Sequence, residues 1–250
     1  MGFLGGINIG DEYLGRSGPF SFWRDTHIAL QGDAVYFLQN SFLTDWYFVS
    51  GQKLTDSYYF PPHMCLDKEH VQIIASGPDD YWDVILEMYF SAIASATKRI
   101  YITSPYFIPD ESILMGLKTA AISGVDVRII FPSVGDSHLV QWASLSYVKE
   151  LLEAGVRFFL YEKGFIHAKV IIIDNVLASV GTANMDMRSF FFSNFEMNAV
   201  MFDKASIERL EADFMHDLTH CSEIKLREFE KRPRLQRGLE VVARLFSPLF

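Results

Sequence analysis

The chain has 250 residues, half of them hydrophobic and 15% aromatic, and its formal net charge is −9. This composition excludes a disordered chain, and the acidic balance argues against non-specific binding of nucleic acid, which needs a basic surface. The two cysteines, Cys65 and Cys221, indicate a reducing compartment, and the lack of any apolar run of roughly 18 residues predicts a soluble or peripheral chain.

The first part of the chain, residues 1–60, contains the run GGINIGD, which parallels the run GTANMD that begins at Gly181. A strand-like apolar run containing Asp25 follows the first of these, and one containing Glu196 follows the second. A predicted helix comes next in both cases. These parallels indicate an internal repeat, in which residues 1–60 are the remainder of a first lobe that has lost its leading strands.

Residues 61–70 are rich in turn formers and are the predicted linker to a second lobe over residues 71–230. In that lobe, apolar β-branched runs alternate with segments of helical periodicity. We expect strands at 71–75, 100–102, 125–131 and 156–161, and helices at 81–97, 111–122, 139–153 and 205–220. Such alternation predicts an α/β layered fold with a mixed, mostly parallel sheet.

Residues 164–189 hold the chemically most informative pattern. The run Val170–Ile173 is short and β-branched, so it predicts a buried strand, and the turn after it leads to a returning strand. Side chains alternate along a strand, so His167 and Lys169 point to the same side. Asp174 has the opposite parity, and we expect it to support the fold or the turn.

Thr182 and Asn184 share a face if the chain stays extended, and Gly181 permits close backbone approach. Together with His167 and Lys169, they would bring a hydroxyl, an amide, an imidazole and a fixed cation to one small space. Such a set suits a phosphate, because the lysine supplies charge, the threonine and asparagine supply hydrogen bonds, and the histidine supplies a nucleophile or a proton.

The tail, residues 231–250, differs from the rest of the chain because it is basic and amphipathic. Two arrangements are open for it, namely contact with a membrane surface and a helix docked on its own domain. Its apolar stripe consists of Leu235, Leu239, Val242, Leu245 and Phe246.

The spacing H-x-K-x4-D-x6-G-[ST]-x-N, which starts at His167, is identified as the HKD motif of the phospholipase D superfamily. Further runs, among them GGINIGDEYLG, FWRDTHIALQG, YITSPYFIPDE and GTANMDMRSFFFSNFE, resemble bacterial cardiolipin synthases of the phospholipase D type. The resemblance covers essentially the whole chain. It implies a layered α/β/α fold with two pseudo-repeated lobes, of which the first is incomplete here.

The resemblance further implies transfer of a phosphatidyl group between two phosphatidylglycerol molecules, through a phosphohistidine intermediate and without metal or organic cofactor. It makes His167, Lys169 and Asp174 the catalytic motif, with His167 as the general acid and base. The other residues that it implies are the phosphate-binding Thr182, Asn184 and Asn8, and two histidine-orienting acids, Glu196 for His167 and Asp25 for the histidine of the first copy.

Members of this family carry two complete motifs and, commonly, membrane segments near the N-terminus. Here the first His-Lys-Asp set would lie before Met1, so we expect an N-terminally truncated chain, inactive alone, from a protein of the bacterial cell membrane. The chain itself would be peripheral or face the cytoplasm. The expected partners are phosphatidylglycerol and an anionic membrane surface, without nucleic acid. Two alternatives stay open: a phosphodiesterase or nuclease of the same superfamily, and a non-catalytic lipid-binding remnant.

Overall fold

A mixed eight-stranded sheet forms the centre of the computed structural model, which describes residues 1–16, 20, 22–63, 65, 69–78, 80–192 and 194–249. Across the sheet the strand order is β14-β8-β7-β5-β10-β11-β13-β4. In chain order these strands are β4 (Val71–Ser76), β5 (Arg99–Thr103), β7 (Asp126–Pro132), β8 (Arg157–Tyr161), β10 (Val170–Ile173), β11 (Leu177–Gly181), β13 (Glu196–Met201) and β14 (Cys221–Glu223).

The sheet is mixed, as predicted. Most of its strand pairings are antiparallel, however, so the prediction of a mostly parallel sheet is wrong. Only β5 with β7 and β7 with β8 pair in parallel, and the other five pairings are antiparallel. One of these antiparallel pairings follows directly from the chain, because the motif strand β10 returns as β11 through a tight turn, and a short turn can join only antiparallel neighbours.

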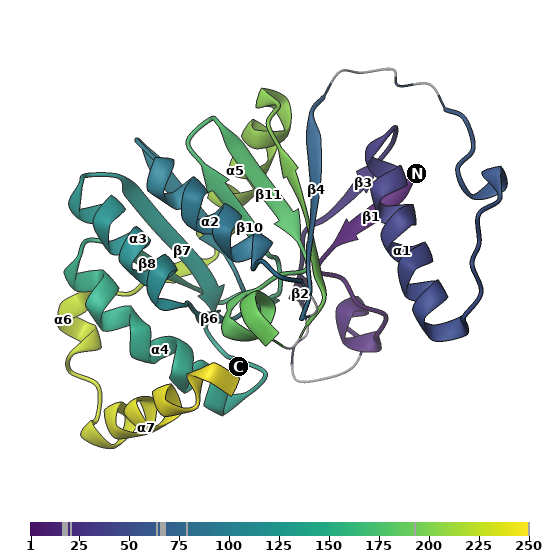
Figure 1. Ribbon diagram of the computed structural model, residues 1–250. Coiled ribbons are helices and arrows are strands. Elements are labelled where there is room, and N and C mark those ends of the chain that lie inside the picture. The colour runs from purple at the N-terminus through teal and green to yellow at the C-terminus, as the bar shows by residue number, and fades with distance from the viewer. Residues whose placement is uncertain are drawn as a thin grey trace.

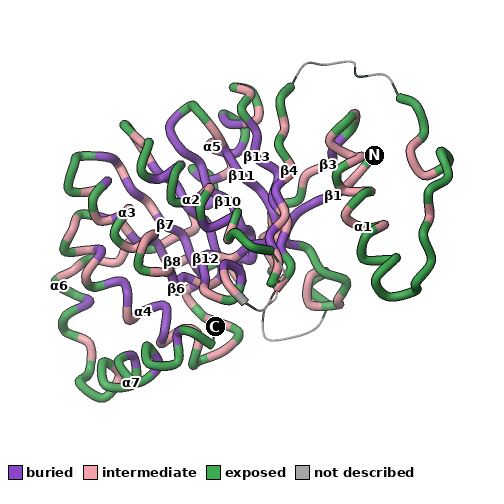
Figure 2. Tube along the Cα trace, in the orientation of Figure 1, coloured by how far each residue is buried: buried purple, intermediate pink, exposed green. Residues whose placement is uncertain are grey.

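Helices cover both faces of this sheet, which confirms the layered α/β/α arrangement (Figure 1). On one face lie α2 (Val84–Ser95), α3 (Glu111–Ile122) and α4 (His138–Glu153), which share a core with Ile100, Ile129 and Ile171. On the other face lies α5 (Lys204–Leu218), which packs on Ile130 and Ile172. Because both faces are covered, all four residues of β10 are buried, and its continuous apolar run follows from that (Figure 2).

Residues 1–60 reproduce part of the same pattern on a smaller scale. They form β1 (Gly2–Gly5), η1 (Asp11–Leu14), β2 (Trp23–Arg24), β3 (His27–Leu30), α1 (Ala34–Ser50) and η2 (Ser57–Tyr59). In β1 and β3 Gly5 lies opposite His27, and in β11 and β13 Gly181 lies opposite Asn198. Asp25 and Glu196 each precede these partners by two residues, so the register matches the internal repeat.

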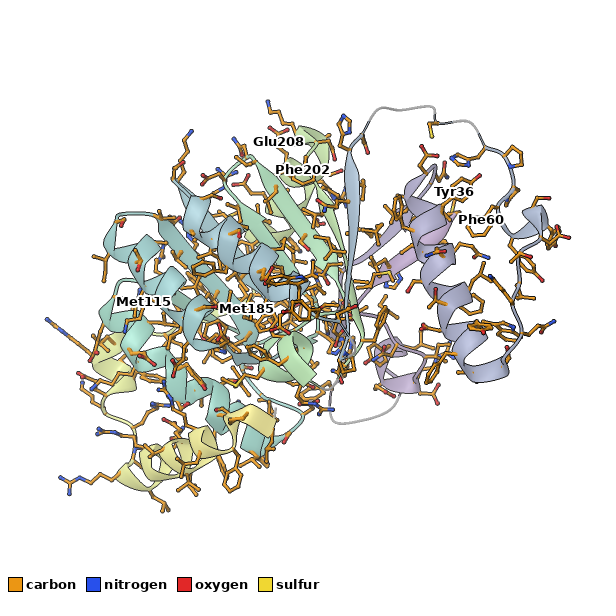
Figure 3. All side chains as sticks on the ribbon, viewed as in Figure 1. Tyr36, Phe60, Met115, Met185, Phe202 and Glu208 are labelled. Atoms are coloured by element: carbon orange, nitrogen blue, oxygen red, sulfur yellow. The ribbon has the colours of Figure 1, made fainter. Side chains whose placement is uncertain are left out.

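The first lobe lies beside the second, and Leu4, Leu30 and Ala199 form a small shared core. After α1 the chain turns back, and Tyr36 packs on Phe60 with ring centroids 5.6 Å apart (Figure 3). In the predicted linker, residues 64 and 66–68 lie outside the described part of the chain, and the described residues there are irregular. The domain boundaries at 60, 70 and 230 stay predictions.

Two short parallel ladders join distant segments below the main sheet. β2 pairs with β9 (Phe165–Ile166), and β6 (Phe107–Ile108) pairs with β12 (Met185–Asp186), which is followed by the π-helix η3 (Arg188–Phe192). The β2–β9 ladder connects the N-terminal lobe to the strand that enters the motif. This connection positions the site.

The C-terminal segment is helical and is docked on its own domain. It contains α6 (Leu226–Phe229), α7 (Arg234–Leu245) and η4 (Ser247–Leu249), and Arg244 on α7 pairs with Glu150 on α4 at 2.9 Å. Among the described residues, no helix has the length and apolar character that crossing a bilayer requires.

Candidate active site

The β2–β9 ladder brings Asp25 to His167. Arg24 lies opposite Ile166 in this ladder, and the backbone N–H of His167 donates to the carbonyl oxygen of Arg24 at 2.7 Å. The next residue on each strand therefore lies beside the other, and Oδ2 of Asp25 is 2.9 Å from Nδ1 of His167. With the Nδ1 proton held by this carboxylate, the lone pair of the neutral ring is at Nε2.

This contact overturns the prediction that Glu196 orients His167. The carboxylate of Glu196 accepts hydrogen bonds from the hydroxyl of Thr182, from Nδ2 of Asn194 at 3.0 Å and from the hydroxyl of Ser189 at 3.4 Å. The prediction paired each acid with the histidine of its own repeat. The structure instead pairs the acid of the first repeat with the histidine of the second, because a parallel ladder joins the two copies.

Lys169 lies beside the same imidazole, as the shared strand face predicted. Its ammonium Nζ is 2.8 Å from Nε2 and 3.0 Å from Nδ1 of His167, and it donates to the carbonyl oxygen of that residue at 2.6 Å. Burial lowers the pKa of Lys169 to about 8, although Asp25 and Glu196 act in the opposite direction. The lysine therefore stays mostly charged at neutral pH.

The pKa of His167 also lies below its ordinary value. Burial is the largest cause, and the charge of Lys169 adds to it, whereas the hydrogen bond to Asp25 acts to raise the pKa. The imidazole is therefore neutral at pH 7. A neutral ring with a fixed tautomer can act as a base or a nucleophile, and the carboxylate at Nδ1 stabilises the imidazolium that forms when it takes a proton.

Aromatic side chains surround His167, and the sequence analysis did not identify them as part of the site. The ring centroids of Tyr13 and Trp23 both lie 5.5 Å from that of His167, and Phe165 lies at 6.1 Å. Trp23 and Phe165 are partners in the β2–β9 ladder. The only signal for them in the sequence is their position next to the site residues Asp25 and His167.

Asp174 lies at the far end of β10 from Lys169 and does not take part in this cluster. Its carboxylate accepts hydrogen bonds from the N–H groups of Thr97, Lys98 and Arg99, at 2.9, 2.8 and 2.7 Å, and from the hydroxyl of Thr97. Burial acts to raise its pKa, but these hydrogen bonds outweigh it and hold the pKa below its ordinary value. The parity argument is confirmed, because Asp174 supports the turn, and the assignment of Asp174 to the catalytic groups stays a prediction.

Asp174 also has a left-handed backbone conformation, with φ of 51°, and it is the one non-glycine residue with positive φ in the described part of the chain. Aspartate tolerates this conformation better than β-branched residues do. The residue therefore makes the β10–β11 turn and ties it to the start of β5.

The predicted phosphate-binding residues Thr182, Asn184 and Asn8 differ in how they are placed relative to His167 and Lys169. Thr182 and Asn184 follow β11 at the same end as Lys169, and Oδ1 of Asn184 is buried without a hydrogen-bond partner among the described residues. The hydroxyl of Thr182 donates to Glu196. Asn8 is exposed, and its Nδ2 donates to the hydroxyl of Tyr13 at 2.8 Å, which links it to the ring beside His167. Their phosphate-binding roles stay predictions.

Several carboxylates act on the single motif lysine. Asp25, Glu196, Asp186 and Asp136 all raise the pKa of Lys169. Burial raises the pKa values of Glu196 and Asp186 themselves. Among the described residues, four carboxylates thus act on one motif lysine, so their negative charges outnumber its single positive charge.

Among the residues that the structure describes, one group of side chains has spacing compatible with a metal ion, and it is remote from His167 in the sequence. Ligand atoms of Asp33, His63 and Cys65 lie within 4.8 Å of one another, and all three residues are exposed. The ring of His63 already contacts Asp33 and the hydroxyl of Tyr36, each at 2.9 Å.

Comparison with known proteins identifies the family. The family model described as "Cardiolipin synthase, PLD-like domain" matches residues 89–218, which run from within α2 to the end of α5 and include the whole His167 motif. The chain belongs to this family. The cardiolipin synthase of Geobacillus kaustophilus is 51% identical to it and is matched over 100% of this chain but 50% of its own length.

Other relatives agree with this assignment. Cardiolipin synthase 2 of Bacillus anthracis is 51% identical, matched over 99% of this chain and 48% of its own length. The chain thus spans about half the length of the curated cardiolipin synthases that it matches.

Two solved structures show the phospholipase D fold that the sequence predicts for this family member. The phospholipase D family member Nuc of Salmonella typhimurium matches 63% of this chain and 99% of its own, with a TM-score of 0.52 at 22% identity. The phosphatidylserine synthase of Haemophilus influenzae matches 72% and 47%, with a TM-score of 0.58 at 13% identity.

Proposed function

We propose that this chain is the part of a cardiolipin synthase that carries the second HKD motif, and that the whole enzyme transfers a phosphatidyl group between two phosphatidylglycerol molecules. The observation that carries the proposal is the contact of Asp25 with Nδ1 of His167, with Nζ of Lys169 close to both ring nitrogens. An oriented neutral imidazole beside a fixed cation suits proton transfer at a phosphodiester.

In this reaction a nucleophilic histidine from the first motif attacks phosphorus, and the bond from phosphorus to the glycerol headgroup oxygen breaks. His167 enters this step in its protonated form, which is the minor form at pH 7 and is stabilised by the Asp25 carboxylate, and it gives its proton to the leaving glycerol. It then takes a proton from the headgroup hydroxyl of a second phosphatidylglycerol, whose oxygen attacks phosphorus and breaks the phosphorus–nitrogen bond. Cardiolipin and glycerol result, and both histidines return to their starting states.

The arrangement of the two acids supports a site assembled from both repeats. Asp25 serves the histidine of the second copy, so by the same symmetry Glu196 would serve the histidine of the first. A second HKD lysine would also balance the carboxylates that surround Lys169. The second histidine and lysine would come from a segment that carries His-x-Lys-x4-Asp. This segment would precede Gly5 in the chain, in the same way as His167 precedes Gly181.

The proposed substrates are membrane lipids, so the proposed partners are phosphatidylglycerol and an anionic membrane surface, without nucleic acid. The proposed location of the whole enzyme is the bacterial cell membrane, with this chain at its surface. No metal or organic cofactor is part of the proposed reaction.

A thin-layer assay of radiolabelled phosphatidylglycerol tests the proposal. Two proteins are compared, the 250-residue chain alone and the chain extended by an upstream segment that carries the first His-x-Lys-x4-Asp. We expect cardiolipin and glycerol from the extended protein only, with loss of at least about a thousandfold in rate for His167→Ala.

The same two proteins are incubated with plasmid DNA as the control for the superfamily alternative. Cleaved DNA without lipid turnover would replace the synthase assignment with a nuclease. Cardiolipin formation by the 250-residue chain alone, abolished by His167→Ala, would contradict the requirement for a second histidine.

A further inference from the structure

The C-terminal helix α7 turns its apolar side toward solvent. Glu240 and Ala243 are its buried residues, whereas Leu235 and Leu245 are each 77% exposed and Val242 is 51% exposed. Figure 2 shows the helix as a mostly exposed segment at the edge of the molecule. A helix that covers a core has the opposite arrangement, with its apolar stripe inward.

Polar contacts hold the helix in this orientation. Glu240 pairs with Arg232 through two hydrogen bonds, at 2.5 and 2.9 Å. Arg244 pairs with Glu150 at 2.9 Å, and its guanidinium lies 4.3 Å from the ring centroid of Tyr147. Because these partners lie on the inner side, the apolar residues are left on the outer side.

The exposed apolar side chains continue past the end of α7 into η4. On a helical wheel the exposed residues Leu235, Leu239, Val242, Leu245 and Phe246 fall within one arc, and exposed Leu249 in η4 follows it. We call these six residues the apolar arc.

Cations flank the apolar arc. Residues 231–250 contain five basic residues and one acidic residue, Glu240, which gives a charge of +4 in a chain of net charge −9. Lys231, Arg234 and Arg237 make no ion pair with any residue that the structure describes. An apolar arc with unpaired cations beside it has the pattern of a helix that lies in the headgroup region of an anionic bilayer.

A cavity beside the helix reaches the segment that follows β12. A cavity of about 360 Å³ separates α7 from α3 and is lined by Pro109, Met187 and Arg244, among other residues. Met187 is three residues after Asn184, and Pro109 follows β6, which pairs with β12. In Figure 1 the C-terminus lies at the end of the sheet where β6 and β2 lie, far from α1.

We propose that the apolar arc of α7 and η4 docks this chain on an anionic lipid bilayer, with the helix axis in the plane of the interface and the loop after β12 facing the lipid. The choice of phosphatidylglycerol as the lipid rests on the proposed function, whereas the docking surface rests on the arc and its cations. In this orientation the helix places the headgroups of membrane lipids on the side of the molecule where Met187 and Pro109 lie.

Flotation of the 250-residue chain with vesicles tests this surface. The vesicles contain phosphatidylcholine alone or an equal mixture with phosphatidylglycerol, and binding is measured without turnover. In the arc variant Leu235, Val242 and Leu245 are replaced by serine, and we expect binding to the mixed vesicles to weaken about tenfold or more. In the charge variant, Arg234→Gln with Arg237→Gln, we expect a loss of about tenfold on mixed vesicles only.

The matched control is α1, which also exposes apolar side chains but has no basic residue in its span. Replacement of its exposed Phe42, Phe48 and Val49 by serine should leave vesicle binding unchanged. All substituted side chains are exposed, so circular dichroism spectra should match that of the parent chain.

Three results would overturn the proposal: no binding of the parent chain to mixed vesicles, equal binding by the arc variant, or equal loss in the α1 control. Sedimentation that shows a dimer dependent on the arc, together with no vesicle binding, would assign the arc to a second copy instead. A failure of the lipid-turnover assay alone would leave the docking surface intact, so the two proposals fail separately.

Discussion

Asp25 and His167 are 142 positions apart in the chain, yet Oδ2 of the first lies 2.9 Å from Nδ1 of the second. Each belongs to a different copy of the internal repeat. The parallel pairing of Trp23 with Phe165 and of Arg24 with Ile166 sets this contact, because the next residues on both strands are the aspartate and the histidine. The motif histidine of one repeat is therefore oriented by an acid of the other.

The first prediction follows from that contact. Asp25→Asn should lower the pKa of His167, because the hydrogen bond and charge of the carboxylate raise it while burial and Lys169 lower it. Glu196→Gln should have a smaller effect, since Glu196 contacts Thr182 and Asn194 instead. Nuclear magnetic resonance titration of the His167 ring in both variants measures the two shifts. A larger shift in the Glu196 variant would restore the arrangement predicted from the sequence.

The second prediction concerns Lys169, whose pKa falls from 10.5 to about 8 because it is buried. Between pH 8 and 10.5 the unfolded chain binds more protons at this residue than the folded chain, so its contribution to the free energy of unfolding rises with pH. The gain over Lys169→Met should reach at most about 3 kcal/mol across this interval. Urea unfolding of both proteins at several pH values measures it, and parallel pH profiles would refute the lowered pKa.

The third prediction concerns the turn residue Asp174. Asp174→Ala leaves the N–H groups of Thr97, Lys98 and Arg99 without their acceptor, so the free energy of unfolding should fall by about 3–5 kcal/mol. The measurement is urea unfolding at pH 7, with Asp174→Asn as the variant that keeps one acceptor oxygen and the left-handed backbone.

The pH dependence of this loss has a defined sign. The folded pKa of Asp174 is lower than the ordinary 3.8, so the carboxylate stabilises the fold fully above that value. Its contribution decreases as the pH falls through the lowered folded pKa. The difference between the parent chain and Asp174→Asn should therefore shrink below pH 3.8, and a difference that grows in acid would contradict the assigned shift.

The fourth prediction concerns the anchor of strand β2. Arg24 pairs with the buried Asp217 of α5 through Nε and Nη2, each at 2.9 Å. Arg24→Ala leaves that carboxylate buried without its partner, and the fold should lose about 3–5 kcal/mol. The double variant Arg24→Ala with Asp217→Asn should lose less than the sum of the single variants, as a double-mutant cycle by urea unfolding would measure. Additive losses would show that the pair does not hold β2 in place.

The sequence by itself determined the local elements and the composition of the site. The helices at 111–122 and 139–153 are observed at Glu111–Ile122 and His138–Glu153, because periodicity and caps act within a few residues of each other. Parity along one strand was enough to place His167 beside Lys169 and to turn Asp174 away from them. The spacing of the motif was enough to indicate the family.

Only the tertiary structure decided which acid meets His167, how the strands pair and which side of α7 is outward. Each depends on contacts between segments that are far apart in the chain, which local pattern does not encode. The β2–β9 ladder places Asp25 beside His167, and Glu196 contacts Thr182 instead. The pairing of β13 with β4 and of β10 with β5 is antiparallel although long segments separate these strands in the chain. In α7 Glu240 and Ala243 face inward, and the apolar stripe lies outside.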